Sequence, residues 1–303
     1  MTQNDVSQRP IAASFLLLFG CIILGLVIGT FVGQIIAAGI VGIQLTDFQK
    51  FISAPANYPN AWIALLVMQG ISALIGFVGA SWVYIKLFER KKLSYLLPSI
   101  QPAQLSLLII LLTITAFPFN GWVIQWNQSI HFPDGIDEYF RSEEKKMAIL
   151  TQFLTDFHGT WQLILALLVM AFIPAIGEEL LFRGIIQNLI LRGVRNVHAA
   201  VWISAFVFSA VHLQFFGFVP RLLLGALLGY LYAWTGSLRA AILAHFVNNS
   251  ATLLIVYFFK AKISFLEGDA QPHVPVFGAV VSLLFVIGLM IQIRKITAET
   301  TNT

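Results

Sequence analysis

The sequence predicts an all-α, polytopic membrane helix bundle of about eight transmembrane helices. Apolar residues make up 58% of the 303 residues and charged residues only 11%, whereas soluble domains carry about 25% charged residues. The apolar residues gather into runs of about 20, the length that a helix needs to cross a bilayer. These runs lack the alternation of apolar and polar residues that a membrane β-barrel requires.

Composition also limits the classes of function. It excludes an ordinary soluble enzyme, a disordered chain and a nucleic-acid-binding protein. The net charge of +4 is modest, and we assign it to the orientation of the loops rather than to a polyanionic partner. The single cysteine, Cys21, excludes an intramolecular disulfide and a multi-cysteine metal site.

The expected spans follow from the apolar runs, taken in order along the chain. They are residues 11–42, 61–88, 103–126, 161–191, 197–216, 219–235, 238–259 and 274–293. The fifth and sixth are short and are separated only by Gly217 and Phe218. Lys and Arg are more frequent in the loops that share a side with the N-terminus, which predicts that both termini lie in the cytoplasm.

The longest loop, residues 127–160, has the pattern of an amphipathic helix. Apolar side chains recur there at helical spacing beside a run of Glu and Lys; they are Phe140, Met147, Leu150, Leu154 and Phe157. We expect a helix that lies on the membrane surface.

The fourth span contains the charged residues that need an explanation. Glu178, Glu179 and Arg183 lie within one apolar helix, where each charge costs about 2.5–3.5 kcal/mol on insertion scales. Glu179 and Arg183 are four residues apart, so they share a face and are expected to form an ion pair. Glu178 is turned about 100° away. It is therefore free to react, and burial suits it to act as a general acid or base.

Two further pairs of residues share helix faces at a spacing of four. They are Phe208 with His212 and His245 with Asn249. Glu178 and His212 lie about 25 Å from their common turn, but His245 lies only about 12 Å from its own turn. The four polar groups can meet, in the cytoplasmic half of the bilayer, if the turn near residues 192–196 projects further into the cytoplasm.

The three motifs together resemble the CPBP intramembrane proteases, a family that includes CAAX prenyl endopeptidases and bacteriocin-processing or immunity proteins. EExxxR is Glu178 to Arg183, FxxxH is Phe208 to His212, and HxxxN is His245 to Asn249. The resemblance covers residues 178–249. We therefore expect two parts. The apolar runs and the amphipathic loop give membrane helices and a surface helix in residues 1–160, and the resemblance implies a catalytic core in residues 161–303, which end with a last transmembrane helix.

The resemblance also implies roles and partners. Glu178 would activate water with the help of His212, while His245 and Asn249 would stabilise the oxyanion; Glu179, Arg183 and Phe208 would support the site. The substrate would be a membrane-associated peptide or lipidated protein, in contact with membrane lipid and with no nucleic acid involved. A bacterial inner membrane is the expected location.

Alternatives remain open at this point. His212, His245 and Glu178 could instead ligate zinc with an open position for water, although neither histidine has a second histidine four residues away, as HExxH requires. We prefer the version without metal or cofactor. Intramembrane Glu and His also occur in proton-coupled transporters, and a non-catalytic immunity protein could retain the same polar site.

Overall fold

The structure is a computed structural model that describes residues 9–92, 96–97, 102–259 and 274–301. The described residues form helices and no strands, which confirms the all-α class. Seven helical segments are long and apolar enough to cross a membrane, so the chain is a multi-pass integral membrane protein. In the described part they are Ile11–Val41, Ala61–Glu89, Ala103–Gln128, Thr160–Val194, Phe215–Thr235, Leu238–Phe259 and Val276–Glu299.

The expected fifth span is not among these seven, so in the described part of the chain the prediction of about eight spans is one too many. The helix there, α12 (Val197–Ala210), ends six residues before the predicted limit. The chain reverses direction directly afterwards, with Leu213 in a left-handed conformation at φ 54° and a short 3-10 helix, η8 (Phe215–Gly217). His212 therefore lies in a turn rather than on a helix face.

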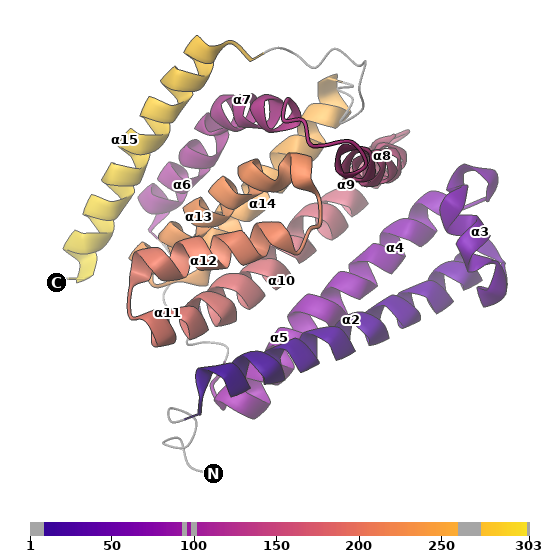
Figure 1. The fold of residues 1–303 in the computed structure, drawn as a ribbon, viewed down its shortest axis with the longest axis horizontal. Helices are drawn as coiled ribbons and strands as arrows, with labels where there is room; N and C mark the ends of the chain where they lie inside the picture. Colours follow the sequence, from indigo (N-terminus) through magenta and orange to yellow (C-terminus); the bar gives the residue numbers. More distant parts are fainter. Residues whose placement is uncertain (1–8, 93–95, 98–101, 260–273, 302–303) are drawn as a thin grey trace.

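The first two spans form a pair that lies beside the rest of the bundle (Figure 1). The first span is α2 (Ile11–Val41). The second is continuous and consists of α4 (Ala61–Ala73), η3 (Leu74–Gly79), α5 (Ala80–Tyr84) and η4 (Ile85–Glu89). Three short helices join the two spans: η1 (Leu45–Asp47), α3 (Phe48–Ser53) and η2 (Pro55–Asn57). Glycines on α2 allow close packing; a Cβ on Gly25 would lie 3.0 Å from the Cβ of Ala80.

The span that carries the charged residues is a long helix with two π-helical turns. Its parts are α9 (Thr160–Ala166), η6 (Leu167–Phe172), α10 (Ile173–Leu181), η7 (Phe182–Gln187) and α11 (Asn188–Val194). Pro174 is the second residue of α10, just after the first π turn, where the widened helix accommodates a residue that has no N–H group. The second π turn contains Arg183, and such turns often occur at functional sites.

The remaining spans are α6 (Ala103–Thr115) with α7 (Phe117–Gln128), α13 (Phe218–Thr235), α14 (Leu238–Phe259) and α15 (Val276–Thr301). Of these, α13 and α14 contact the helix that carries the charged residues, and α6, α7 and α15 pack on the other side of α13 and α14 (Figure 1). Helix α12 lies against α13, and α14 lies against α10 and α6. The core on the charged helix is apolar and includes Leu180, Phe182, Ile185 and Phe208. Charges in the fourth span are thus surrounded by packed hydrocarbon.

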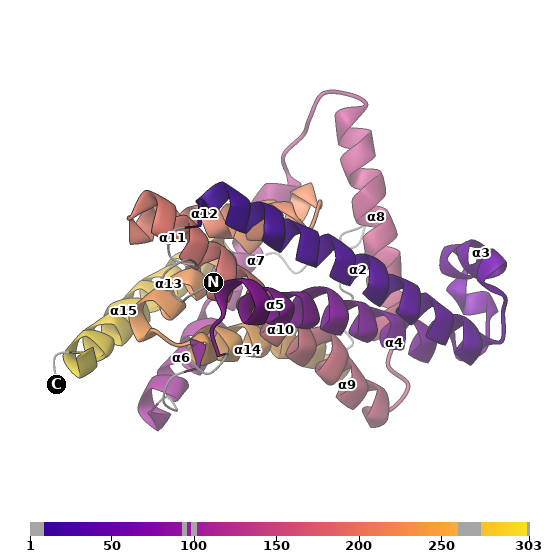
Figure 2. The same cartoon turned by 90° about the horizontal axis from the view of Figure 1, so that it is seen from below.

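Helix α8 (Ile136–Thr155) crosses the ends of the spans. Figure 1 shows it end-on while the long helices run across the view, and Figure 2 shows it lengthwise. This is the orientation of a helix that lies along a membrane surface, so the expectation of a helix here is confirmed. Two details differ from the expected apolar face. Phe157 lies beyond the end of the helix, and Met147 is 43% exposed whereas the side chain of Glu144 is buried, with 3% of its surface exposed.

Candidate active site

The predicted ion pair between Glu179 and Arg183 is present and fully buried. Nη1 of Arg183 donates to Oε1 of Glu179 at 2.7 Å, and their side chains are 1% and 0% exposed. Nη2 of Arg183 donates to the carbonyl oxygen of Gly225 on α13 at 2.8 Å. The guanidinium also lies over the ring of Phe208, 4.8 Å from its centroid. The pair therefore joins α10, η7, α12 and α13.

His245 is held by the same carboxylate, a contact that sequence reasoning missed. Its Nδ1 lies 2.8 Å from Oε1 of Glu179, and its Nε2 lies 3.8 Å from Oε2 of Glu178. A carboxylate accepts hydrogen bonds, so Nδ1 must carry the proton and Nε2 faces Glu178. The sequence could have suggested this contact, because one carboxylate can accept hydrogen bonds from more than one donor and no ion-pair partner had been assigned to His245.

Glu178 differs from its neighbour in exposure and in bonding. Its side chain is 16% exposed, and its nearest ionisable contact is His245. Among the described residues, its carboxylate accepts no hydrogen bond and makes no ion pair with Arg183. The helical spacing predicted this division, because Glu178 faces away from Arg183. The site thus contains one committed carboxylate and one available carboxylate.

His212 approaches the site from the turn after α12. Its Nδ1 lies 2.8 Å from the carbonyl oxygen of Phe208; since that oxygen only accepts, Nδ1 is the donor and Nε2 remains available. The buried ring of Phe208 contacts both histidines, with its centroid 5.2 Å from that of His212 and 6.0 Å from that of His245. Phe208 therefore packs against both imidazoles.

Asn249 is less closely joined to the other predicted residues. It lies one turn along α14 from His245, and its Oδ1 accepts from Nδ2 of Asn248 at 3.1 Å. In the described part of the chain no hydrogen bond joins its side chain to Glu178 or to either histidine. The structure thus brings Glu178, Glu179, Arg183 and His245 into one network, with His212 attached through Phe208 and Asn249 through its helix.

A second polar cluster lies next to His212 and was not predicted. Arg221 in the first turn of α13 donates from Nη2 to Oε1 of Gln214 at 2.8 Å. Nε2 of Gln214 lies 3.5 Å from Oε1 of the buried Glu144 on α8. Burial raises the pKa of Glu144, while the positive charge of Arg221 acts in the opposite direction. The sequence offered one indication of this cluster, an arginine shortly after the Gly217–Phe218 break between two apolar runs.

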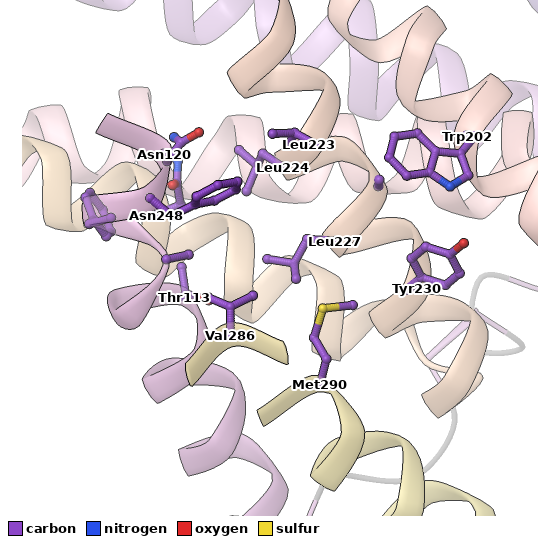
Figure 3. A pocket seen from close by; sticks show the side chains of 14 residues that line it. Thr113, Asn120, Trp202, Leu223, Leu224, Leu227, Tyr230, Asn248, Val286 and Met290 are labelled. Carbon is purple, nitrogen blue, oxygen red and sulfur yellow. The ribbon is translucent and has the colours of Figure 1, made fainter. Parts of the chain in front are cut away.

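An apolar cavity of about 200 Å³ lies beside α13. Figure 3 shows Leu224, Leu227, Trp202 and Met290 among the side chains that line it. Asn248 also lines the cavity and donates to Asn249. The cavity wall therefore continues into the helix that carries His245.

The fit of a zinc ion can be judged from the donor atoms. Within the described ranges, no group of three or more His, Cys, Asp or Glu side chains is arranged to hold a metal ion. His245 uses Nδ1 on Glu179, and His212 uses Nδ1 on a backbone carbonyl. These bonds leave both Nε2 atoms available, as in zinc-bound histidines whose Nδ1 donates to a carboxylate or a carbonyl. In the described residues, however, the side chains as placed do not converge on one ion.

Comparison with known proteins supports the motif-based resemblance. Residues 160–251 match the family model described as type II CAAX prenyl endopeptidase Rce1-like. This stretch begins in α9, ends in α14 and contains the seven site residues predicted from the sequence: Glu178, Glu179, Arg183, Phe208, His212, His245 and Asn249. The match confirms the resemblance to the CPBP proteases over these residues, and the matched family is one of CAAX endopeptidases.

A curated relative matches over a shorter stretch. It is the "Uncharacterized protein YpbD" of Bacillus subtilis (strain 168), 29% identical over 85 residues. The match covers 27% of this chain and 40% of the relative, so it spans less than half of that protein's length. No solved structure matches the chain.

Proposed function

We propose that the Rce1-like segment, residues 160–251, is the catalytic part of an intramembrane endopeptidase. One observation carries the proposal. Glu178 is a partly exposed carboxylate without a hydrogen bond in the described structure, and it lies 3.8 Å from the imidazole of His245 that Glu179 holds in place. A carboxylate that water can reach, beside an oriented nitrogen, suits general base catalysis.

The proposed reaction is hydrolysis of a peptide bond. Glu178 accepts a proton from water while the water oxygen bonds to the carbonyl carbon and the carbonyl electrons move onto its oxygen. Nε2 of His212 orients the water. In the proposed reaction His245 carries a proton on both ring nitrogens, so Nδ1 donates to Glu179 while Nε2 of His245 and Nδ2 of Asn249 donate to the oxyanion. The carbonyl then re-forms, the C–N bond breaks, and Glu178 returns its proton to the leaving nitrogen. No metal or cofactor enters this scheme.

The apolar cavity beside α13 supports a lipidated substrate. Its lining is mostly hydrocarbon, and through Asn248 it adjoins α14, which carries His245 and Asn249. We assign it to the lipid chain of the substrate. Leu227→Trp should fill the cavity and slow cleavage of a lipidated peptide while leaving cleavage of the same peptide without lipid unchanged. Equal slowing of both peptides would reject this assignment.

The proposed location is a bacterial inner membrane with both termini in the cytoplasm. The bond of 2.9 Å between Arg192 and Ser14 places the turn before α12 at the N-terminal end of the bundle. Helix α12 runs from there to the end where α8 lies, and His212 follows it. With the N-terminus in the cytoplasm, this proposed orientation puts His212 toward the outer surface rather than in the cytoplasmic half that the residue count indicated.

The experiment that tests the activity compares membranes that contain the protein with membranes that contain Glu178→Gln. Mass spectrometry of peptide ends should find cleavage products only with the unaltered protein. Glu143→Gln, an exposed change on α8, is the matched control and should behave like the unaltered protein. Identical product sets from the protein and Glu178→Gln would reject the proposed function and favour a transporter or a non-catalytic protein.

A further inference from the structure

Two guanidinium groups lie near the proposed catalytic residues, and their bonding differs. Arg183 is committed to Glu179 and to the carbonyl of Gly225. Among the described residues, the guanidinium of Arg221 donates to Gln214 alone, from Nη2 to the side-chain oxygen at 2.8 Å and from Nη1 to the backbone oxygen at 3.3 Å. Within the described part of the chain, no carboxylate lies at ion-pair distance from Arg221. Its charge therefore has no direct counterion.

The surroundings of Arg221 hold its guanidinium in a defined place. Its guanidinium packs on Gly217, where a side chain would overlap it. Gln214, which accepts both of its hydrogen bonds, is two residues after His212 in the same turn. Because Gln214 also contacts the buried Glu144, the position of Arg221 is linked to α8. The arginine is thus pre-positioned next to His212.

The charges around Arg221 place it within the electrostatic field of the site. It interacts at a distance with Glu178, Glu144 and His212. Glu178 and Glu144 would repel an anionic group of a substrate that approached the site. In the described structure Arg221 has no carboxylate at ion-pair distance, so its charge would offset this repulsion. A guanidinium also matches the geometry of a carboxylate, with two parallel hydrogen bonds.

We infer that Arg221 is a specificity-determining residue that binds a carboxylate of the peptide substrate while Glu178 acts on the scissile bond. The inference rests on the proposed peptidase function. The carboxylate can belong to the C-terminus of the substrate or to an acidic side chain near the cleavage point. In either case Gln214 holds the arginine ready, and binding replaces the distant interactions with a direct ion pair.

The test uses the full-length protein in proteoliposomes and a peptide that it cleaves. The peptide is prepared with a free C-terminal carboxylate, as the C-terminal amide, and as the amide with Glu as the last residue. Arg221→Gln should lower kcat/KM for the preferred acidic form roughly 10- to 100-fold, the loss of a charged hydrogen bond, mainly through KM. The neutral amide should change little. If the protein cleaves the free acid faster than both amides, Arg221 binds the C-terminal carboxylate. If it cleaves the Glu-amide as fast as the free acid, Arg221 also binds an acidic side chain.

Arg239→Gln, an arginine change near the start of α14, is the matched control and should leave all three rates unchanged. Arg221→Lys should recover part of the preference because it keeps the charge. If the protein cleaves the acid and amide forms equally, or if Arg221→Gln slows both equally, the inference is wrong although the peptidase function stands. If no peptide is cleaved by the unaltered protein, the proposed function fails, and the inference fails with it.

Discussion

Replacing Arg183 tests the network that holds the site together. Arg183→Met keeps length and apolar volume but removes the charge, so it leaves the fully buried Glu179 without its cation. Breaking a buried ion pair in this way costs about 3–5 kcal/mol. The lost bond to Gly225 at 2.8 Å adds to the cost. Oε2 of Glu179 and Nε of Arg183 lack a hydrogen-bond partner in the described part, so the ion pair is incompletely bonded. We therefore expect a loss of about 3 kcal/mol, the lower end of the range for a buried ion pair.

The assay is thermal unfolding in detergent, with a double-mutant cycle to isolate the pair. Arg183→Met alone should lower the melting temperature by several degrees. Glu179→Gln combined with Arg183→Met should recover much of that loss, because no uncompensated charge remains buried. Lys146→Ala, which removes an exposed ion pair, is the control and should not shift the melt. The reasoning would be refuted if Arg183→Met melted at the temperature of the unaltered protein, or if the loss in the double variant equalled the sum of the losses in the two single variants.

Three other changes give distinct outcomes. Glu144→Gln should raise the melting temperature at neutral pH. Burial raises the pKa of the Glu144 carboxyl above its ordinary value of 4.5, so ionising this group costs stability as the pH rises. The gain from the substitution should shrink in acid, and a lower melting temperature of the variant at neutral pH would contradict this reasoning. Leu213→Asn should stabilise by up to about 1 kcal/mol, because Asn tolerates the left-handed conformation better and the leucine is 84% exposed; a clear loss of stability in denaturation would reject this. Chelators should leave peptidase activity intact, whereas loss of activity with recovery on adding zinc would favour the metal-dependent alternative.

The sequence was sufficient for local features whose geometry a helix dictates. Spacing along one helix placed Glu179 with Arg183 and turned Glu178 away from both, and the structure shows that arrangement. Apolar runs predicted the spans because the bilayer sets their length. The amphipathic pattern predicted α8, although not that Glu144 would face inward.

Contacts between helices were harder to predict, because helix tilt and turn shape are set by packing. Counting residues from the turns gave His245 a different depth from Glu178, yet the 2.8 Å contact with Glu179 brings them to one level. The turn at Leu213 ends α12 early and moves His212 off the helix. The cluster of Glu144, Gln214 and Arg221 joins segments far apart in sequence. The arginine after the Gly217–Phe218 break was a local signal for one member but did not indicate its partners.

The most direct measurement of the central claim is peptide hydrolysis by purified protein in proteoliposomes, with Glu178 replaced by Gln. The substitution keeps size and polarity but removes the base. The account predicts that hydrolysis falls to background while the melting temperature stays close to that of the parent protein. Hydrolysis at the parental rate by a folded Glu178→Gln protein would contradict the claim that this carboxylate activates water.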